Sequence, residues 1–430
     1  MMGGTEMKHL GDITKINGAE IEAVDVITGG SPCQDLSIAG KRAGLAGARS
    51  GLFMAQIRIV KEMREHDRAN GRTGDMVRPR FMVWENVPGA FSSNKGKDFA
   101  AVLEEIIRIA EPEAPDIEVP EKGWNTWGGY HDEVGGRWSV AWRVHDAQYW
   151  GVAQRRRRIS VVADFGGDTA GEILFERKSV SGHLAESGAA WERLAGDAQD
   201  GASYAVRIRG GCDGGGKGAL VQTEKSGTLG TGNDQMIAHS HGVFATAIGN
   251  QAPLAYGIGN GQACEASIMA EGIAQTLNTM HDAQAVMCED VSHALRAKAN
   301  CAYREDAETY PVQNMVVRRL TPMECERLQG FPDHWTDIGE WRDSKGKLRK
   351  PSDSPRYKAL GNSIALPFWD FLAKRISAQY LRPVTMGSLF DGIGGFPLVF
   401  ERHNGKGTAR WASEIEEFPI AVTKLRFGED

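Results

Sequence analysis

The sequence contains no apolar run approaching the 18 residues that a membrane-spanning helix needs. Its first residues, 1–10, are polar and include no apolar signal core. We therefore expect a cytoplasmic protein with no membrane partner, and we expect it to be a monomer.

Cysteine is scarce, with six residues in a chain of 430. No two of them form a Cys-x-x-Cys pair, and no histidine cluster accompanies them. Scattered cysteines in so long a chain favour neither a zinc site nor a disulfide framework, so we expect no metal. The six are Cys33, Cys212, Cys264, Cys288, Cys301 and Cys325.

The sequence also lacks an excess of positive charge. Lysine and arginine number 50 against 56 acidic residues, which gives a net charge of −6. This balance argues against a protein that coats nucleic acid non-specifically, but it allows a local basic cleft. A phosphate-binding loop ending in Gly-Lys-Ser/Thr is absent as well.

The chain has the composition of a soluble protein and is longer than one hydrophobic core usually organises. Hydrophobic residues make up 41% and charged residues 25%, so we expect a large domain with a second lobe. Strand-like and helix-like patterns alternate in segments 1–169 and 316–430, which predicts an α/β fold. Segment 170–315 loses this alternation, and 16 of the 53 glycines fall within 201–280. An irregular lobe with short strands is the prediction there, and disorder is the alternative.

A glycine-rich turn at 390–395 (Phe-Asp-Gly-Ile-Gly-Gly) joins a predicted strand to a predicted helix. Such glycines allow a ligand to approach the backbone, and the helix start offers free N–H groups. Glu414 ends the next predicted strand, where a carboxylate can accept hydrogen bonds from a ribose. The pattern favours an adenosine-cofactor site over a purely structural turn or a phosphate loop.

Three further signals carry possible chemistry, each with a plainer alternative. Cys33 follows a predicted strand in a Gly/Pro loop and is either an accessible thiol or a small buried residue. Glu85 ends the predicted strand 81–84 and is either a proton donor beside apolar neighbours or a solvated carboxylate. The arginine run 155–158 either binds phosphate, a base oxygen or a carboxylate, or is a solvated charge run.

Taken together, these residues resemble the DNA (cytosine-5)-methyltransferases of phage and restriction–modification type. The resemblance covers nearly the whole chain except the glycine-rich segment. The matching blocks are Gly30-Ser-Pro-Cys33-Gln34, Glu85-Asn-Val87, Gln154-x-Arg156-x-Arg158, 319–332, Gly361-Asn362-Ser363 and 390–395. It implies a Rossmann-like methyltransferase sheet built from 1–169 and 316–430, with a smaller, partly β target-recognition domain at 170–315. It also implies a prokaryotic or phage-infected cell as the setting.

The order of the blocks departs from the family pattern. In most members the cofactor loop opens the chain and the Gly-Asn-Ser block closes it, whereas here the cofactor loop and Glu414 come last. The tail 426–430 would continue smoothly into 7–12. The sequence therefore resembles a circularly permuted member, which compact domains with neighbouring ends tolerate.

The reaction implied by the resemblance uses three residues and S-adenosylmethionine as methyl donor. Cys33 attacks C6 of a cytosine flipped out of double-stranded DNA, and Glu85 donates a proton or hydrogen bond at N3. Arg156 hydrogen-bonds O2 and helps to hold Glu85. C5 then accepts the methyl group, and loss of its proton releases Cys33.

The resemblance also implies two sets of binding residues. The cofactor set is Phe390, Asp391, Gly392, Gly394, Gly395, Glu414, Ile415, Asp12, Ile13, Pro32, Leu52, Asn362 and Ser363. The expected DNA contacts are Gln34, Ser37, Lys41, Arg42, Arg49, Gln154, Arg158, Arg207, Arg209, Lys217 and Lys225, the last four as candidates within the glycine-rich segment.

Three other functions stay open at this point. A small branch of the family methylates transfer RNA, although the long 170–315 segment favours duplex DNA. A catalytically silent DNA-binding module is possible, although Cys33, Glu85 and Arg156 argue against it. A nicotinamide oxidoreductase would rest on the glycine turn alone and would leave the other blocks unexplained.

Overall fold

A computed structural model describes residues 6–31, 50–133, 135–152, 154–175 and 320–428, and the backbone of the strands between 203 and 319. We call 6–175 and 320–428 together the main body. Some predictions fall outside the described residues, namely those for Pro32, Cys33, Gln34, Ser37, Lys41, Arg42, Arg49, Lys217 and Lys225. For Arg207 and Arg209 only the backbone, within a strand, is described.

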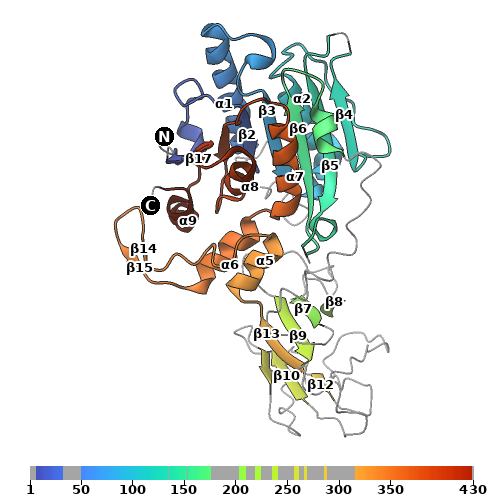
Figure 1. The fold of residues 1–430 in the computed structure, drawn as a ribbon. Coiled ribbons are helices and arrows are strands. Elements are labelled where there is room, and N and C mark those ends of the chain that lie inside the picture. The colour runs from blue at the N-terminus through green and yellow to red at the C-terminus, as the bar shows by residue number, and fades with distance from the viewer. Residues whose placement is uncertain are drawn as a thin grey trace.

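The main body is built on one sheet in the order β1-β17-β16-β2-β3-β6-β5-β4. The first five strands of this order are parallel and the last three are antiparallel. Both ends of the chain thus contribute neighbouring strands (Figure 1). The strands are β1 (Lys8–His9), β2 (Val26–Gly29), β3 (Phe81–Asn86), β4 (Trp127–His131), β5 (Ser139–Asp146), β6 (Arg157–Asp164), β16 (Met386–Leu389) and β17 (Ala409–Ser413).

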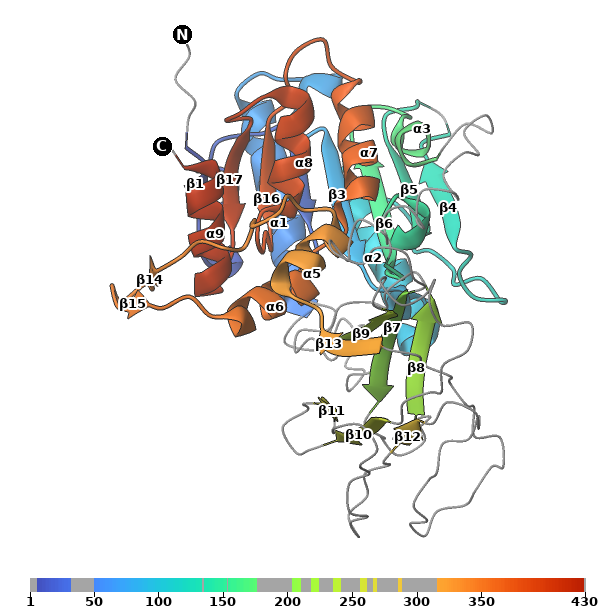
Figure 2. The ribbon, with the colours of Figure 1, turned by 60° about the horizontal axis from the view of Figure 1, so that its bottom comes forward.

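Helices cover both faces of this sheet because its strands alternate between two apolar cores. Ile27, Met82 and Trp84 pack with α1 (Ser50–Ala69) and α2 (Lys97–Ile107). Their neighbours Val26, Phe81 and Val83 pack with α7 (Leu366–Ser377) and α8 (Gly395–Asn404) on the other face (Figure 2). The α/β fold predicted from the alternation of patterns is confirmed, and the structure shows it to have three layers.

The connections around β16 and β2 place a switch point in the sheet. From β16 the chain moves outward through α8 to β17, whereas from β2 it moves the opposite way through α1 to β3. At such a point the two loops leave the carboxyl edge in opposite directions and open a crevice that commonly binds a ligand. Leu389 pairs with Gly29, so the 390–395 turn and the Gly30 loop start side by side.

Two helices and a hairpin lie below the main sheet (Figure 2). Thr321 and Glu324 form a full capping box that opens α5 (Pro322–Gln329). β14 (Trp341–Arg342) and β15 (Leu348–Arg349) form a small hairpin, and α6 (Asp353–Asn362) follows it. The last described element is α9 (Glu417–Phe427).

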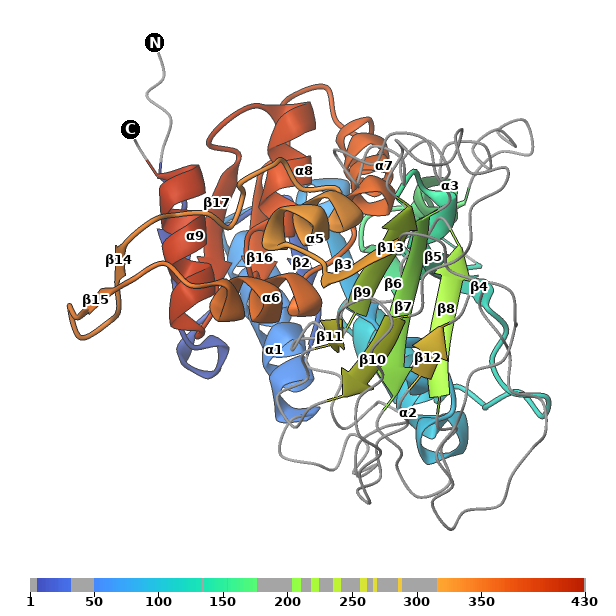
Figure 3. The same cartoon turned by 90° about the horizontal axis from the view of Figure 1, so that it is seen from below.

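The described strands of the second lobe form two antiparallel sheets (Figure 3), ordered β13-β9-β7-β8 and β11-β10-β12. They comprise β7 (Ser203–Arg209), β8 (Gly218–Thr223), β9 (Gln235–Ser240), β10 (Tyr256–Asn260), β11 (Ala266–Ile268), β12 (Ala285–Met287) and β13 (Met315–Arg319). The short helix α3 (Ala170–Leu174) instead packs on the main sheet, where the Ala170 amide donates to Ser139 Oγ at 3.1 Å. Among the described helices, none is long and apolar enough to cross a membrane.

Candidate active site

Ser31 ties the loop after β2 to the neighbouring strand. The Trp84 indole N–H donates to Ser31 Oγ at 3.0 Å, and Asn86 Nδ2 donates to the Ser31 carbonyl at 3.3 Å. All three groups are buried. The Glu-Asn-Val block therefore fixes the chain two residues before Cys33, which a linear motif does not reveal.

Glu85 lies between Trp84 and Asn86 in β3, and its carboxylate lies against Gly30. A Cβ added to Gly30 would meet Glu85 Oε2 at 2.8 Å, closer than real Cβ contacts come. A glycine is therefore required at position 30 if Glu85 is to keep this place. The Glu85 side chain is 14% exposed, so it lies in the wall of the site rather than in open solvent.

Arg158 forms an ion pair with Glu85, with 2.8 Å between Nε and Oε1. The Arg158 side chain is 15% exposed, so solvent weakens this pair less than it weakens a surface pair. The sequence had indicated Arg156 as the support of Glu85 and Arg158 as a DNA contact. In the structure the observed support of Glu85 is Arg158, on β6, and the DNA contact of Arg158 stays a prediction.

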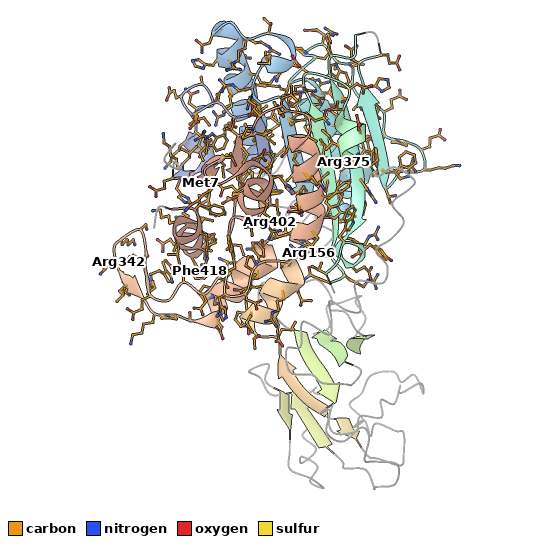
Figure 4. The ribbon with its side chains drawn as sticks, in the orientation of Figure 1. Met7, Arg156, Arg342, Arg375, Arg402 and Phe418 are labelled. Carbon is orange, nitrogen blue, oxygen red and sulfur yellow. The ribbon has the colours of Figure 1, made fainter. Side chains whose placement is uncertain are left out.

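Arg156 is buried and contacts the backbone of the Gly-Asn-Ser block. Its Nη2 donates to the carbonyl oxygens of Gly361, at 3.3 Å, and Ser363. Its own amide donates to Asp146 Oδ1 at 3.0 Å, which fixes the turn before β6. Arg156 is 2% exposed, at the edge of the main body that faces the second lobe (Figure 4). It therefore secures the Gly-Asn-Ser block to the arginine block.

The turn at 390–395 has the backbone that its glycines predict. Phe390, Gly392 and Gly394 all have positive φ, of 56°, 59° and 80°. Glu414 braces the turn, because its Oε2 accepts the Gly392 amide at 2.8 Å. Its Oε1 accepts the amides of Ile415 and Glu416 at 2.7 and 2.8 Å, so the carboxylate is held at the end of β17.

Asp391 is a buried carboxyl in this turn, 6% exposed. Neither of its carboxyl oxygens has a hydrogen-bond partner among the described residues. Burial, reinforced by the negative charge of Glu414, raises the pKa of Asp391 to about 8. The turn thus contains a carboxyl that can be neutral at pH 7.

The Gly-Asn-Ser block packs against the turn. A Cβ on Gly395 would meet Ile364 at 2.9 Å, and a Cβ on Gly394 would meet Phe427 at 2.5 Å. Contacts therefore run from Glu85 to Arg158, from Arg156 to Ser363, and from Ile364 to the turn. Blocks that lie hundreds of residues apart in the sequence form one site along the carboxyl edge.

The remaining predicted cofactor residues differ in how far their side chains are exposed. Asp12 caps a short turn by accepting the Thr14 amide at 2.9 Å, a bond that lowers its pKa. Ile13 is 4% exposed and belongs to the core under α1, whereas Ile415 is 70% exposed at the turn. Leu52 is half-buried and Asn362 is exposed.

Two buried amides lie near the site. Gln154, predicted to contact DNA, is fully buried, and its amide has no hydrogen-bond partner among the described residues. Gln56 on α1, which the sequence analysis missed, is equally buried, and a Cβ on Gly29 would meet its amide at 2.8 Å. Gln56 occupies the apolar stripe between Phe53 and Val60, and a polar residue at such a position is the signal that could have identified it.

Comparisons with known proteins agree with this geometry. The model of the C-5 cytosine-specific DNA methylase family matches residues 5–109 and 230–378, more than half of the chain. A protein of Escherichia phage P1 named DNA N-6-adenine-methyltransferase is 30% identical over 87% of this chain and 56% of its own length. The type II methyltransferase M1.ScrFI of Lactococcus lactis subsp. cremoris is 23% identical over 85% of this chain and 65% of its own.

The chain therefore spans about half to two thirds of the length of these two relatives. Among solved structures, the Entamoeba histolytica methyltransferase EhMeth matches with a TM-score of 0.39 and 11% identity, over 86% of this chain and 82% of that one.

Proposed function

The chain belongs to the C-5 cytosine-specific DNA methylase family, and from this membership we propose that it methylates C5 of cytosine in a specific sequence of double-stranded DNA. The observation that carries the proposal is the Glu85–Arg158 pair, held against Gly30 three residues before Cys33. A carboxyl and a guanidinium at this strand edge, with a thiol following Gly30 three residues later in the sequence, are the groups that the chemistry of a pyrimidine ring requires.

Cytosine C5 is a poor nucleophile, and the proposed role of Cys33 is to change that. Its thiolate adds to C6, which breaks the C5–C6 double bond and moves electron density toward C5. Glu85 supplies a proton or hydrogen bond at N3, which favours this addition. After C5 has accepted the methyl group, loss of the C5 proton restores the double bond and expels the Cys33 sulfur.

Arg158 holds Glu85 in place through their 2.8 Å contact and can turn its remaining N–H groups toward the base. The ring atoms are hidden in a duplex, so the cytosine must flip out of the stack to reach these groups. Arg156 acts at a distance from the base, by fixing the Gly-Asn-Ser block below the pocket.

The methyl donor in the proposal is S-adenosylmethionine, and the residues at the switch point fit it. Glu414 is positioned by three backbone amides and keeps lone pairs that can accept ribose hydroxyls. The positive φ of Gly392 leaves the backbone bare beside it, and exposed Ile415 offers an apolar surface to an adenine ring. When bound there, S-adenosylmethionine supplies an electrophilic methyl group.

We place target recognition in the second lobe. Its sheets lie below the carboxyl edge of the main body (Figures 1 and 3), so a duplex between the two parts would face both. Arg207 and Arg209 on β7 stay candidates for base or phosphate contacts. The proposed division of labour is chemistry from the main body and sequence reading from the lobe.

We also propose that the family order has been circularly permuted. The parallel pairing of β1 with β17, at 8–9 and 411–412, supports it, because the two chain ends build adjacent strands. The family model leaves 379–430 unmatched, which is the segment out of its usual place. Joining 428 to 6 and opening the chain near 381 should give an active enzyme. A restored-order protein that does not fold would count against the permutation.

One experiment tests the reaction and separates it from adenine methylation, which the name of the phage P1 relative indicates for that protein. DNA from cells that express the full chain is digested and its nucleosides are quantified by mass spectrometry, with bisulfite sequencing in parallel. We expect 5-methylcytosine at one recurrent sequence. N6-methyladenine alone, or methyl transfer to transfer RNA alone, would refute the proposal.

A further inference from the structure

The hairpin β14–β15 carries a concentration of positive charge that the proposed reaction does not use. Segment 341–350 contains five basic residues and one acidic residue, within a chain of net charge −6. The hairpin projects from the main body on the side opposite β4 in all three ribbon views (Figures 1, 2 and 3). Arg342 marks its position in Figure 4.

The hairpin is a defined structure, held by its single acidic residue. Asp343 Oδ1 accepts the amides of Lys345 and Lys347 at 3.0 and 2.8 Å, and its Oδ2 pairs with Arg349. These bonds also lower the pKa of Asp343, whose side chain is 3% exposed. Arg342 Nη1 closes the turn on the Gly346 carbonyl at 2.9 Å.

The hairpin is anchored to the start of α9 both at its turn, through Ser344, and at its base, through Trp341. Ser344 Oγ donates to Glu417 at 2.5 Å, and Lys358 pairs with Glu416 at 2.9 Å. The Trp341 ring packs edge-on against Phe418, with 5.7 Å between centroids. These contacts fix where the tip points, so little order has to be created when a partner binds.

Three lysines remain available at and beside the tip. Lys345, Lys347 and Lys350 are exposed, and no carboxylate among the described residues lies within ion-pair distance of them. Asp343 is occupied by the hairpin itself, and Glu416 by Lys358. A fixed element that presents three unneutralised ammonium groups fits a regular polyanion better than an apolar or neutral partner.

We propose that this hairpin binds the phosphates of the DNA duplex beyond the recognition sequence. The proposal rests on the proposed function, because the same duplex must have its cytosine in the pocket. α6 joins hairpin to site: its last residues are the Gly-Asn block, and its ten residues span about 15 Å. A duplex of about 40 base pairs, at about 3.4 Å per base pair, extends far enough on either side of the flipped cytosine to reach the hairpin.

The test compares duplex lengths with two matched variants of the full chain. The triple variant Lys345→Gln/Lys347→Gln/Lys350→Gln removes the three charges and keeps the backbone bonds of Asp343. The control Arg68→Gln/Lys374→Gln/Lys406→Gln removes three exposed charges from parts of the main body away from the hairpin. Each protein is titrated with duplexes of about 12 and about 40 base pairs centred on the site found by bisulfite sequencing.

We expect wild type and control to bind the long duplex more tightly than the short one. The hairpin variant should lose this advantage, by roughly tenfold or more at 0.1 M salt, and its salt-dependence slope should fall by about 2–3. Equal long-duplex affinity and slope in all three proteins would overturn the hairpin proposal, and would point to an acidic protein segment as partner. Absence of methyl transfer by wild type on either duplex would instead refute the proposed function.

Discussion

Gly30→Ala tests whether the position of Glu85 controls the reaction. The added Cβ would lie 2.8 Å from Glu85 Oε2, and ordinary contacts begin at 3.4 Å, so the carboxylate must move by about 0.6 Å. A move of that size stretches the 2.8 Å contact with Arg158 to about 3.4 Å, the limit of a hydrogen bond. The pair is then weakened or lost, and Glu85 no longer meets N3 of the base as before.

We expect Gly30→Ala to reduce the rate of methyl transfer more than it reduces the stability of the fold. Forcing an extra methyl group into a packed site costs about 1–3 kcal/mol, which a chain of this size tolerates. A misplacement of about 1 Å can reduce a rate by about 100-fold, so we expect methyl transfer to fall about 10- to 100-fold. Transfer of labelled methyl groups to DNA under single-turnover conditions measures the rate, and thermal unfolding measures the stability.

Gly51→Ala is the matched control, because a Cβ there meets nothing within 4 Å. It should leave both rate and stability nearly unchanged. A Gly30→Ala enzyme whose rate stays within twofold of wild type would refute the reasoning, since the contact with Glu85 would then have no bearing on catalysis.

Three further predictions concern single side chains. Cys33→Ala should abolish methyl transfer while S-adenosylmethionine still binds, and residual turnover by this variant would exclude the thiol mechanism. A duplex that carries 5-fluorocytosine should trap the wild-type protein covalently, as a shift in gel mobility would show. Glu414→Gln exchanges a charged hydrogen-bond acceptor for a neutral amide, so the protein should bind S-adenosylmethionine about tenfold more weakly. Calorimetry without DNA measures this affinity, and an unchanged affinity would exclude Glu414 from the pocket. The pKa of Asp391 is raised by burial to about 8, so its neutral form is favoured by folding and the associated stability is lost as pH rises from about 4 to 8. Urea unfolding should therefore show wild type losing up to about 4 kcal/mol between pH 5 and pH 8 relative to Asp391→Asn, whereas parallel pH profiles would contradict the burial argument.

The sequence predicted most of the main body because its elements have local signatures. Thr321 and Glu324 specify a capping box, and the apolar pattern around Ile27 and Trp84 specifies buried strands. Two elements escaped this reasoning. α6 buries only Ala359 and Leu360 and so shows no apolar stripe. β4 contains Gly128 where a strand favours larger residues, because the Trp142 ring fills the space of its missing Cβ.

The sequence predicted which residues belong to the site, but it did not predict which arginine pairs with Glu85. The resemblance assigned the support of Glu85 to Arg156, but the sequence alone could not tell whether Arg156 or Arg158 meets Glu85. That choice depends on register: β6 runs antiparallel to β3, with Ser160 opposite Glu85, so Arg158 comes within reach. Register between strands some 70 residues apart is set by packing of the whole sheet, which no local pattern contains.

The place of β16 in the sheet has a consequence for synthesis on the ribosome. This strand lies between β2 and β17 yet comprises 386–389, so β2 is made long before its neighbour exists. Until then the growing polypeptide presents β2 as an unpaired edge, and Asp25 waits for Arg382 and Thr385, its partners 357 and 360 residues later. The crevice proposed for S-adenosylmethionine is complete only after β16 and β17 have been translated, so shorter nascent chains would lack the proposed cofactor site.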